Sequence, residues 1–307
     1  MKATAIRGVG TKARPPRSKP KISETISKGL FFISSLVSIG AVIFICIFIF
    51  AGACPAFREI GFVKFITGTV WKPTNDPQEF GILYMIVGSI YVSAGAILLG
   101  VPIGIFSAVF MAKFCPKKLY PILSQAVSLL AGIPSIIYGF FGMMIIVPFI
   151  AEHFQGNGNS VLAASIVLGI MILPTIITIS ENALRALPSS YYEGAIALGA
   201  TKEESVFKVM LPAAKSGIVT SVVLGIGRAI GETIAVGMVA GNSNILPSSI
   251  FKSVRTLTVN IVSEMGYASD LHYDALIATG AVLFIFILIL NLLLGLLVNG
   301  KRGGEKA

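Results

Sequence analysis

Six long stretches of apolar residues, separated by shorter polar segments, dominate this chain. Each stretch has at least the roughly 20 residues that a helix needs to cross the hydrocarbon core of a bilayer. They lie at about residues 30–53, 81–112, 121–151, 160–180, 217–241 and 275–298. This pattern predicts an all-α polytopic membrane protein with six transmembrane helices.

Proline and glycine modify the pattern inside the spans. Pro102, Pro134 and Pro174 lie within the second, third and fourth stretches, where each frees a backbone carbonyl. In lipid that carbonyl needs a partner from a neighbouring helix, so we expect a tightly packed bundle. The second stretch also contains glycines that permit close helix approach, namely Gly88, Gly95, Gly100 and Gly104.

The composition and charge agree with a membrane location. The chain has 307 residues, of which 55% are apolar, and a mean hydropathy of +0.87, which excludes an ordinary soluble domain. Eighteen of its 24 lysines and arginines lie in segments on one side of the predicted spans. Because cytoplasmic segments are enriched in these residues, both termini are predicted to be cytoplasmic. The net charge of +10 is thus a topology signal, and we expect no nucleic-acid partner.

The predicted spans divide the chain into four regions. A basic cytoplasmic tail is followed by the first transmembrane helix with an outer loop, by a five-helix core, and by a short cytoplasmic tail. The core contains a cytoplasmic loop. These regions are residues 1–29, 30–80, 81–298 and 299–307, with the loop at 188–216.

A polar stretch at 193–212 replaces the short connection expected between two spans. Two capping boxes, Ser190–Glu193 and Thr201–Glu204, predict two short helices. Gly199 is the predicted turn between them, and Pro212 the predicted end of the second. A helix–glycine–helix element between membrane spans indicates a surface made for a partner protein.

This stretch resembles the EAA loop of ABC-importer permeases. The family pattern is E-A-A, three residues, G, nine residues, I, one residue, L-P. Here Glu193-Gly194-Ala195 is followed by Gly199 and, after Val209, by Leu211-Pro212, with glycine and valine at two departing positions. The resemblance implies that the first short helix is a coupling helix, seated in a groove of a separate ATPase subunit.

Two charged residues fall inside the fifth predicted span, in the sequence GRAIGETIAVGMVAGN at 227–242. A charge at that depth costs about 2.5–3.5 kcal/mol on insertion scales and usually faces a bundle interior or a water-filled path. Glu232 follows Arg228 by four residues, which on a continuous helix places both on one face. The pair is either a structural ion pair or a step in an anion path, with Thr233 and Asn242 as further donors. Glu232 as a proton-relay carboxylate is the alternative role.

The same sequence resembles phosphate-importer permeases of the PstC type. Further matches are LLAGIPSIIYGFFG (129–142), ISENALRALP (179–188) and LHYDALIATG (271–280). Sulfate and molybdate permeases are similar in the loop but typically have an aromatic residue where Thr233 follows Gly231-Glu232 here. The resemblance therefore favours inorganic phosphate as the substrate, with another oxyanion as the alternative.

That resemblance also implies an assembly. It implies the type I ABC importer (MetI-like) permease fold in a bacterial or archaeal plasma membrane. The expected partners are a second permease subunit of the PstA type, an ATPase dimer of the PstB type and an extracytoplasmic phosphate-binding protein of the PstS type.

The chain itself lacks the motifs of an enzyme. No GxxxxGK[ST] sequence occurs, so ATP hydrolysis is expected in a partner. No His/Cys cluster indicates a metal, and no cofactor is expected. Two alternatives stay open: a secondary transporter with a proton site at Glu232, and a scaffold in a phosphate-sensing complex.

Two outer segments, 54–80 and 243–274, have mixed character. We interpret the first as an interfacial segment with Trp71 as an aromatic anchor, and a contact surface for an external partner is the alternative. Glu181 and Arg185 form a further i,i+4 pair, interpreted as a helix-end ion pair.

Overall fold

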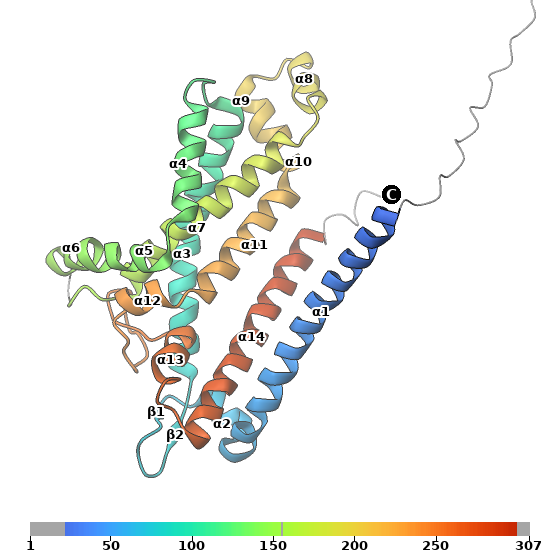
Figure 1. The fold of residues 1–307 in the computed structure, drawn as a ribbon. Coiled ribbons are helices and arrows are strands. Elements are labelled where there is room, and N and C mark those ends of the chain that lie inside the picture. The colour runs from blue at the N-terminus through green and yellow to red at the C-terminus, as the bar shows by residue number, and fades with distance from the viewer. Residues whose placement is uncertain (1–21, 155, 300–307) are drawn as a thin grey trace, which may run out of the picture. The chain divides into compact units, whose positions relative to one another are not determined.

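The computed structural model describes residues 22–154 and 156–299, which are mostly helical (Figure 1). The chain divides into two units, Met1–Phe48 and Ile49–Ala307, and helix α1 (Ile22–Ala56) begins in the first and ends in the second. The part of α1 in the first unit exposes nearly all of its apolar side chains. Most of the predicted tails at 1–29 and 299–307 falls outside the described residues.

The second unit contains the remaining helices and a two-stranded hairpin. In chain order the elements are η1 (Phe57–Gly61), α2 (Phe62–Thr67), β1 (Trp71–Lys72), β2 (Glu79–Phe80), α3 (Leu83–Val109), η2 (Phe110–Phe114), α4 (Tyr120–Gly132), α5 (Ser135–Phe141), η3 (Gly142–Ile146), α6 (Val147–His153), α7 (Val161–Arg185), α8 (Ser190–Ala197), α9 (Lys202–Glu204), η4 (Ser205–Met210), α10 (Leu211–Ala213), α11 (Lys215–Gly231), α12 (Ile234–Val239), α13 (Leu257–Glu264) and α14 (Asp270–Asn299). The η elements are short π-helical turns within or between α-helices.

Within the described residues, five helical segments are long and apolar enough to cross a membrane. They are Ile26–Thr67, Leu83–Phe114, Ser135–His153, Val161–Arg185 and Asp270–Leu293. A sixth is obtained when Lys202–Ala213 and Lys215–Gly231, which are bent by 68°, are counted as one broken span. The predicted number of six is therefore reached only with that bent pair.

Helices α3 and α7 form the centre of the second unit. Added Cβ atoms would meet Ser165 at Gly95, Ile172 and the Gly169 carbonyl at Gly100, and Ile176 at Gly104. The predicted use for close helix approach is confirmed for Gly95, Gly100 and Gly104, whereas a Cβ on Gly88 would meet the Arg255 carbonyl in the segment before α13. The contact of α3 with α7 places the buried residues of α7 in the main apolar core, with Leu168, Met171, Ile172 and Ile176 almost fully buried.

The third predicted span, 121–151, is not one helix. Helix α4 ends at Gly132, Ile133 is extended (φ −69°, ψ 124°), and α5 starts after Pro134. Pro134 has no N–H to donate and disfavours a helical conformation at Ile133. Alone, α4 is roughly 20 Å long, too short for a bilayer core. In Figure 1, α5 and α6 run across the direction of α3.

The fifth predicted span, 217–241, is also broken. Helix α11 ends at Gly231, and Glu232 takes an extended conformation (φ −71°, ψ 134°) before α12 begins at Ile234. The short helices α5 and α12 pack together, and a Cβ on Gly139 would lie 2.9 Å from the Cα of Ala235. The two breaks therefore belong to one region of the bundle.

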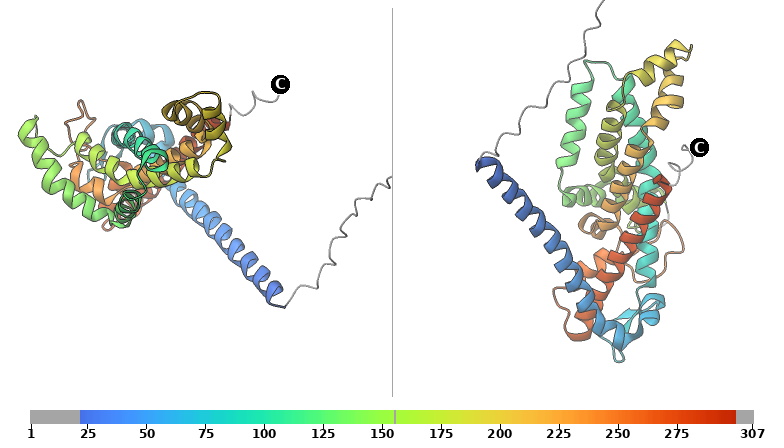
Figure 2. Two further views of the ribbon diagram at one scale, coloured as in Figure 1. Left: turned by 90° about the horizontal axis from the view of Figure 1, so that it is seen from above. Right: turned by 90° about the vertical axis from the view of Figure 1, so that its right-hand side faces the viewer.

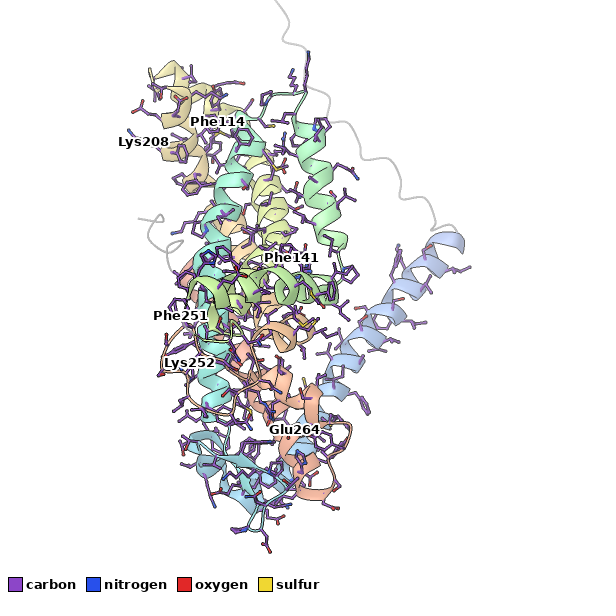
Figure 3. The ribbon with its side chains drawn as sticks, turned by 90° about the vertical axis from the view of Figure 1, so that its left-hand side faces the viewer. Phe114, Phe141, Lys208, Phe251, Lys252 and Glu264 are labelled. Carbon is purple, nitrogen blue, oxygen red and sulfur yellow. The ribbon has the colours of Figure 1, made fainter. Side chains whose placement is uncertain are left out.

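Opposite ends of the second unit carry different structures. Helices α8 to α10 lie at one end, and the β1–β2 hairpin lies with α2 and α13 at the other (Figure 1, Figure 2). Trp71 pairs with Phe80 across the hairpin, and both side chains enter a second apolar core. The side-chain view likewise places Lys208 and Glu264 toward opposite ends (Figure 3).

Candidate functional site

The stretch between α7 and α11 forms the predicted helix–glycine–helix element, which we name the elbow (188–216). Gly199 has φ +88°, a left-handed conformation that glycine adopts without steric cost. Thr201 and Glu204 form a full capping box, with both hydrogen bonds at 3.2 Å. The turn at Gly199 and the second capping box are therefore confirmed.

Two details of the elbow prediction are wrong. The cap of α8 is Ser189, which is itself helical and makes no side-chain capping bond, so Ser190 and Glu193 do not form a capping box. Backbone bonds from Tyr191 to Pro188 and from Tyr192 to Ser189 start the helix instead. Pro212 does not end the second helix, because α10 continues to Ala213 and the chain bends at Ala214.

An apolar cluster attaches the elbow to the ends of α3 and α7. Its buried members come from four elements and the bend, and they are Val109, Leu184, Val206, Met210, Ala214 and Ile218. Arg185 adds polar contacts, because its Nε donates to Glu181 (2.7 Å) and its Nη2 donates to the Met111 carbonyl (2.9 Å). This geometry confirms the helix-end ion pair and links α7 to η2, while the apolar cluster holds η4 and the bend at Ala214 against the bundle.

The α8 side of the elbow is exposed. Glu193 and Gly194 are exposed while Ala195 is buried, and Leu198 is 91% exposed at the tip beside Gly199. Tyr191 and Ile196 are exposed as well, so α8 and its turn carry several exposed apolar side chains together with a carboxylate, the mixed chemistry of a protein-docking surface. Leu211 is partly buried against the cluster below, and Pro212 is exposed.

The predicted pairing of Arg228 with Glu232 is wrong. Because α11 ends at Gly231, the two residues do not share a helical face. Glu232 Oε1 instead accepts from the Ala235 N–H (3.1 Å), which caps the start of α12. Among the described residues Arg228 forms no ion pair with a carboxylate.

The break at Glu232 is held by neighbouring groups. The Thr258 hydroxyl of α13 donates to the Glu232 carbonyl (2.9 Å), and the Thr233 hydroxyl donates to the Gly231 carbonyl (3.3 Å). Arg228 is exposed in the last turn of α11 and interacts electrostatically with Tyr138 of α5. Non-helical backbone at membrane depth is tolerated where protein buries it or where it lines a water-filled cavity. The arrangement can therefore present a guanidinium to an anion.

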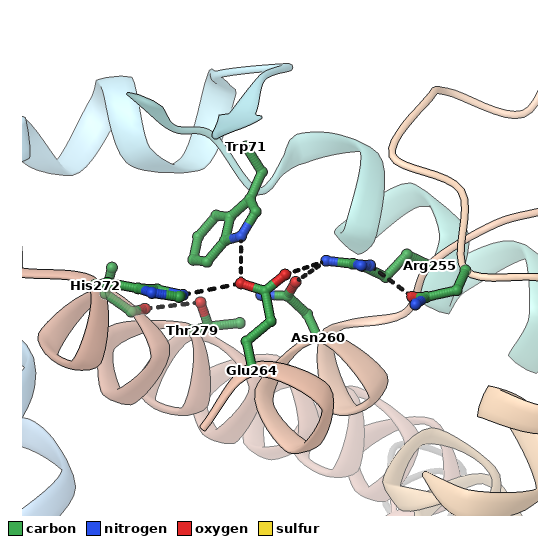
Figure 4. Close-up of polar contacts among 8 residues, drawn as sticks. Trp71, Arg255, Asn260, Glu264, His272 and Thr279 are labelled. Atoms are coloured by element: carbon green, nitrogen blue, oxygen red, sulfur yellow. Dashed lines mark hydrogen bonds and ion pairs between the residues drawn. The ribbon is translucent and has the colours of Figure 1, made fainter. Parts of the chain in front are cut away.

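A buried polar group at the opposite end, which we name the outer cluster, was not predicted (Figure 4). Its centre is Glu264, which pairs with Arg255, accepts from Trp71 Nε1 (2.9 Å) and lies 2.9 Å from His272 Nε2. Partial desolvation and then the Glu264 charge raise the pKa of the nearby Tyr267 phenol. Trp71 is only 4% exposed, so its interpretation as an interfacial anchor is wrong.

The outer cluster could be suspected from sequence only in part. Arg255, Glu264 and His272 are charged or titratable residues in a segment that also contains an apolar stretch. Trp71 lies 193 residues before Glu264, so no local sequence pattern predicts the contact between them. Asn242, expected near Arg228, instead accepts from Arg255 Nε (2.6 Å).

Solved structures of transporters share this fold. The chain superposes with a TM-score of 0.63 and 16% identity on a crystal structure of a bacterial ABC transporter involved in alginate import, covering 93% of this chain and 99% of that one. The MetNI methionine ABC transporter gives a TM-score of 0.59 and 21% identity, with 74% and 99% covered. The fold is that of a type I ABC importer permease, as predicted.

Sequence comparison defines the family. The profile of the binding-protein-dependent transport system inner membrane component matches residues 100–302. The chain is 39% identical to the "Probable ABC transporter permease protein YqgH" of Bacillus subtilis, over 90% of this chain and 93% of that protein. It is 37% identical to the phosphate transport system permease protein PstC of Mesorhizobium japonicum, with 81% of each covered. The chain belongs to the binding-protein-dependent transport system inner membrane component family and is a multi-pass permease.

The capping role of Glu232 generates a prediction. Glu232→Ala removes the acceptor of the Ala235 N–H, so the amides at the start of α12 are expected to exchange about fivefold faster, the effect of a lost cap. Glu232→Gln keeps an acceptor oxygen and is the matched control. Hydrogen-exchange mass spectrometry of peptides covering 232–240 measures the difference, and equal exchange in both variants would contradict the capping role.

Proposed function

We propose that this chain is the permease subunit of an ATP-driven importer of inorganic phosphate. The observation that carries the proposal is Arg228, an exposed arginine without a carboxylate partner in the described structure, one turn before the break at Glu232. The names of relatives that are phosphate transport system permeases from Mesorhizobium japonicum and Pasteurella multocida support phosphate as the anion.

The proposed path uses three residues in different ways. Arg228 binds the phosphate, because its planar guanidinium offers paired donors to an oxyanion. Glu232 acts through the backbone: its carboxylate caps α12 and is held away from Arg228, so the cation is not neutralised. Thr233 follows in the non-helical segment and offers a hydroxyl beside the path.

The proposed coupling to ATP uses the elbow. Glu193, Gly194, Ala195 and Gly199 shape the exposed α8 and its turn, while Leu211 and Pro212 belong to the supported part near the bend. A separate ATPase dimer of the PstB type would dock on α8. The exposed apolar side chains of Tyr191, Ile196 and Leu198 support this role, because grouped apolar side chains at a surface are typical of interaction sites.

The proposed assembly has two further partners. A second permease of the PstA type would complete the path, and an extracytoplasmic phosphate-binding protein of the PstS type would dock at the end that carries the hairpin. The family description, which names binding-protein-dependent transport, supports the last partner. Exposed apolar residues of α5 and η3, such as Phe140 and Met144, support burial against another membrane subunit or lipid.

Uptake of radiolabelled phosphate by the assembled system in vesicles tests this function. ATP-dependent uptake that excess sulfate or molybdate does not reduce is expected. Inhibition by sulfate or molybdate would indicate that the chain belongs to a permease for one of those oxyanions. Uptake driven by a pH gradient without ATP would favour the secondary transporter. A variant that no longer transports phosphate but still signals would favour the scaffold alternative.

Arg228 provides the first site test. Arg228→Gln is expected to reduce phosphate uptake by about 10- to 100-fold, the value of a hydrogen bond to a charged group. Arg228→Lys keeps the charge without the planar fork and should retain part of the activity. Arg58→Gln, which removes an exposed arginine in η1, is the control. Equal uptake by Arg228→Gln and the control would exclude Arg228 from the path.

The two glycines of the elbow provide a matched pair. A Cβ at either Gly194 or Gly199 would meet no atom within 4 Å, but only Gly199 has a positive φ, of +88°. Gly199→Ala therefore adds about 1–2 kcal/mol of backbone strain and is expected to weaken ATPase association. Gly194→Ala is expected to leave it unchanged. Co-purification of the ATPase with each variant measures this, and equal loss would contradict a conformational role for Gly199.

The proposed orientation places both termini in the cytoplasm. Asn75, in the loop of the hairpin, and Lys118, between η2 and α4, are both exposed. The hairpin and the start of α4 lie at opposite ends of the second unit (Figure 1). In intact cells a membrane-impermeant thiol reagent is expected to label Asn75→Cys, and to label Lys118→Cys only after permeabilisation, in a background without the native cysteines. The opposite labelling would invert the orientation.

A further inference from the structure

The outer cluster joins elements that are far apart in the sequence. Glu264, the last residue of α13, is 5% exposed and contacts the hairpin, the segment before α13, and α14. Oε2 faces Trp71 and His272, while Oε1 faces Arg255. Such a buried carboxylate is stabilised only while its donors are in place, since an unpaired charge there is costly.

Helix α13 connects this cluster to the break in the fifth span. It has eight residues. Near its start, Thr258 donates to the Glu232 carbonyl (2.9 Å), and at its end Glu264 accepts from Trp71 (2.9 Å). The Leu257 N–H donates to Ser89 of α3 (3.0 Å). A rigid helix of about 12 Å therefore joins the hairpin to the backbone beside Arg228.

The hairpin itself is suited to contact with an external protein. Residues 74–78 between its paired ends are exposed, whereas Trp71 and Phe80 are buried. A hollow of about 570 Å³ beside the loop is lined mainly by polar side chains, including Lys64, Asp76 and Gln78. The tip is thus free to bind a polar surface while its base is held by Glu264.

We propose that Glu264 is a positioning residue that transmits docking at the hairpin through α13 to the break at Glu232. This inference rests on the proposed function, in which a phosphate-binding protein docks at this end. Docking that displaces the hairpin displaces α13 through the Trp71–Glu264 contact. The Thr258–Glu232 contact then moves the break, and the position of Arg228 follows.

The hydrogen bonds made by Glu264 explain why a carboxylate is needed at this position. Three donors converge on the two oxygens of Glu264, from Trp71, His272 and Arg255. Glutamine has one acceptor oxygen, and its amide group would face a donor. Trp71→Phe is the milder variant, because it keeps an aromatic ring in the apolar core and removes only the donor that links the hairpin to Glu264.

The test compares basal ATP hydrolysis with hydrolysis stimulated by the phosphate-loaded binding protein, in the assembled complex in nanodiscs. Trp71→Phe is expected to reduce the stimulation about tenfold with basal hydrolysis unchanged, since a hydrogen bond to a charged group is lost. Glu264→Gln is expected to reduce it at least as much. Ser165→Ala, which removes a buried bond to Val92 elsewhere, is the control and should leave stimulation intact.

Thr258→Val removes the hydrogen bond at the other end of α13 without a change in side-chain shape. It is the variant to use if Trp71→Phe does not fold. Alone it should also reduce stimulation, and combined with Trp71→Phe it should add little, because both variants interrupt one route. Unchanged stimulation in the folded variants, or fully additive losses, would overturn the inference. A wild-type complex that shows no stimulation and no phosphate uptake would instead overturn the proposed function.

Discussion

The structure depends on one constraint: polar backbone groups within a membrane must find partners inside the protein. Two of the predicted spans are broken, at Ile133–Pro134 and at Glu232–Thr233. The second break is held by the Glu232 carboxylate on one side and the Thr258 hydroxyl on the other. In the described structure the Glu232 carboxylate serves as this helix cap and forms no ion pair with Arg228. Because the carboxylate satisfies a backbone N–H at the break, the Arg228 guanidinium remains available to a ligand.

The close contact of α3 with α7 makes this arrangement possible. Gly95, Gly100 and Gly104 bring the two helices together so that they form the fixed part of the second unit. The broken helices pack around that part, and the elbow is attached to the ends of α3 and α7 by its own apolar cluster. Substitutions that separate α3 from α7 would therefore affect the elbow and the break together, although neither is in direct contact with these glycines.

The sequence predicted local structure correctly where the residue type strongly favours one backbone conformation or one capping interaction. Gly199 and the Thr201–Glu204 box follow from local backbone chemistry, and both are present as predicted. Hydropathy identified the apolar stretches but could not show where the helix axis changes direction within them. The breaks at Pro134 and Glu232 were therefore not predicted, although a proline inside a span indicates a possible break. Trp71 and Glu264 meet only through tertiary packing, which no spacing along the chain encodes.

The 68° bend at Ala214 has a mechanical consequence. Ala214 is buried in the cluster that holds the elbow, and α11 extends from it along α7 as an arm that carries Arg228 in its last turn. Arg228 lies about 21 Å along that arm, at 1.5 Å per residue. A tilt of about 10° at the bend would sweep the guanidinium through roughly 4 Å, given that arm length. Because Ser221 of α11 is hydrogen-bonded to Ser180 of α7 (2.7 Å), such a tilt would have to move α7 together with α11.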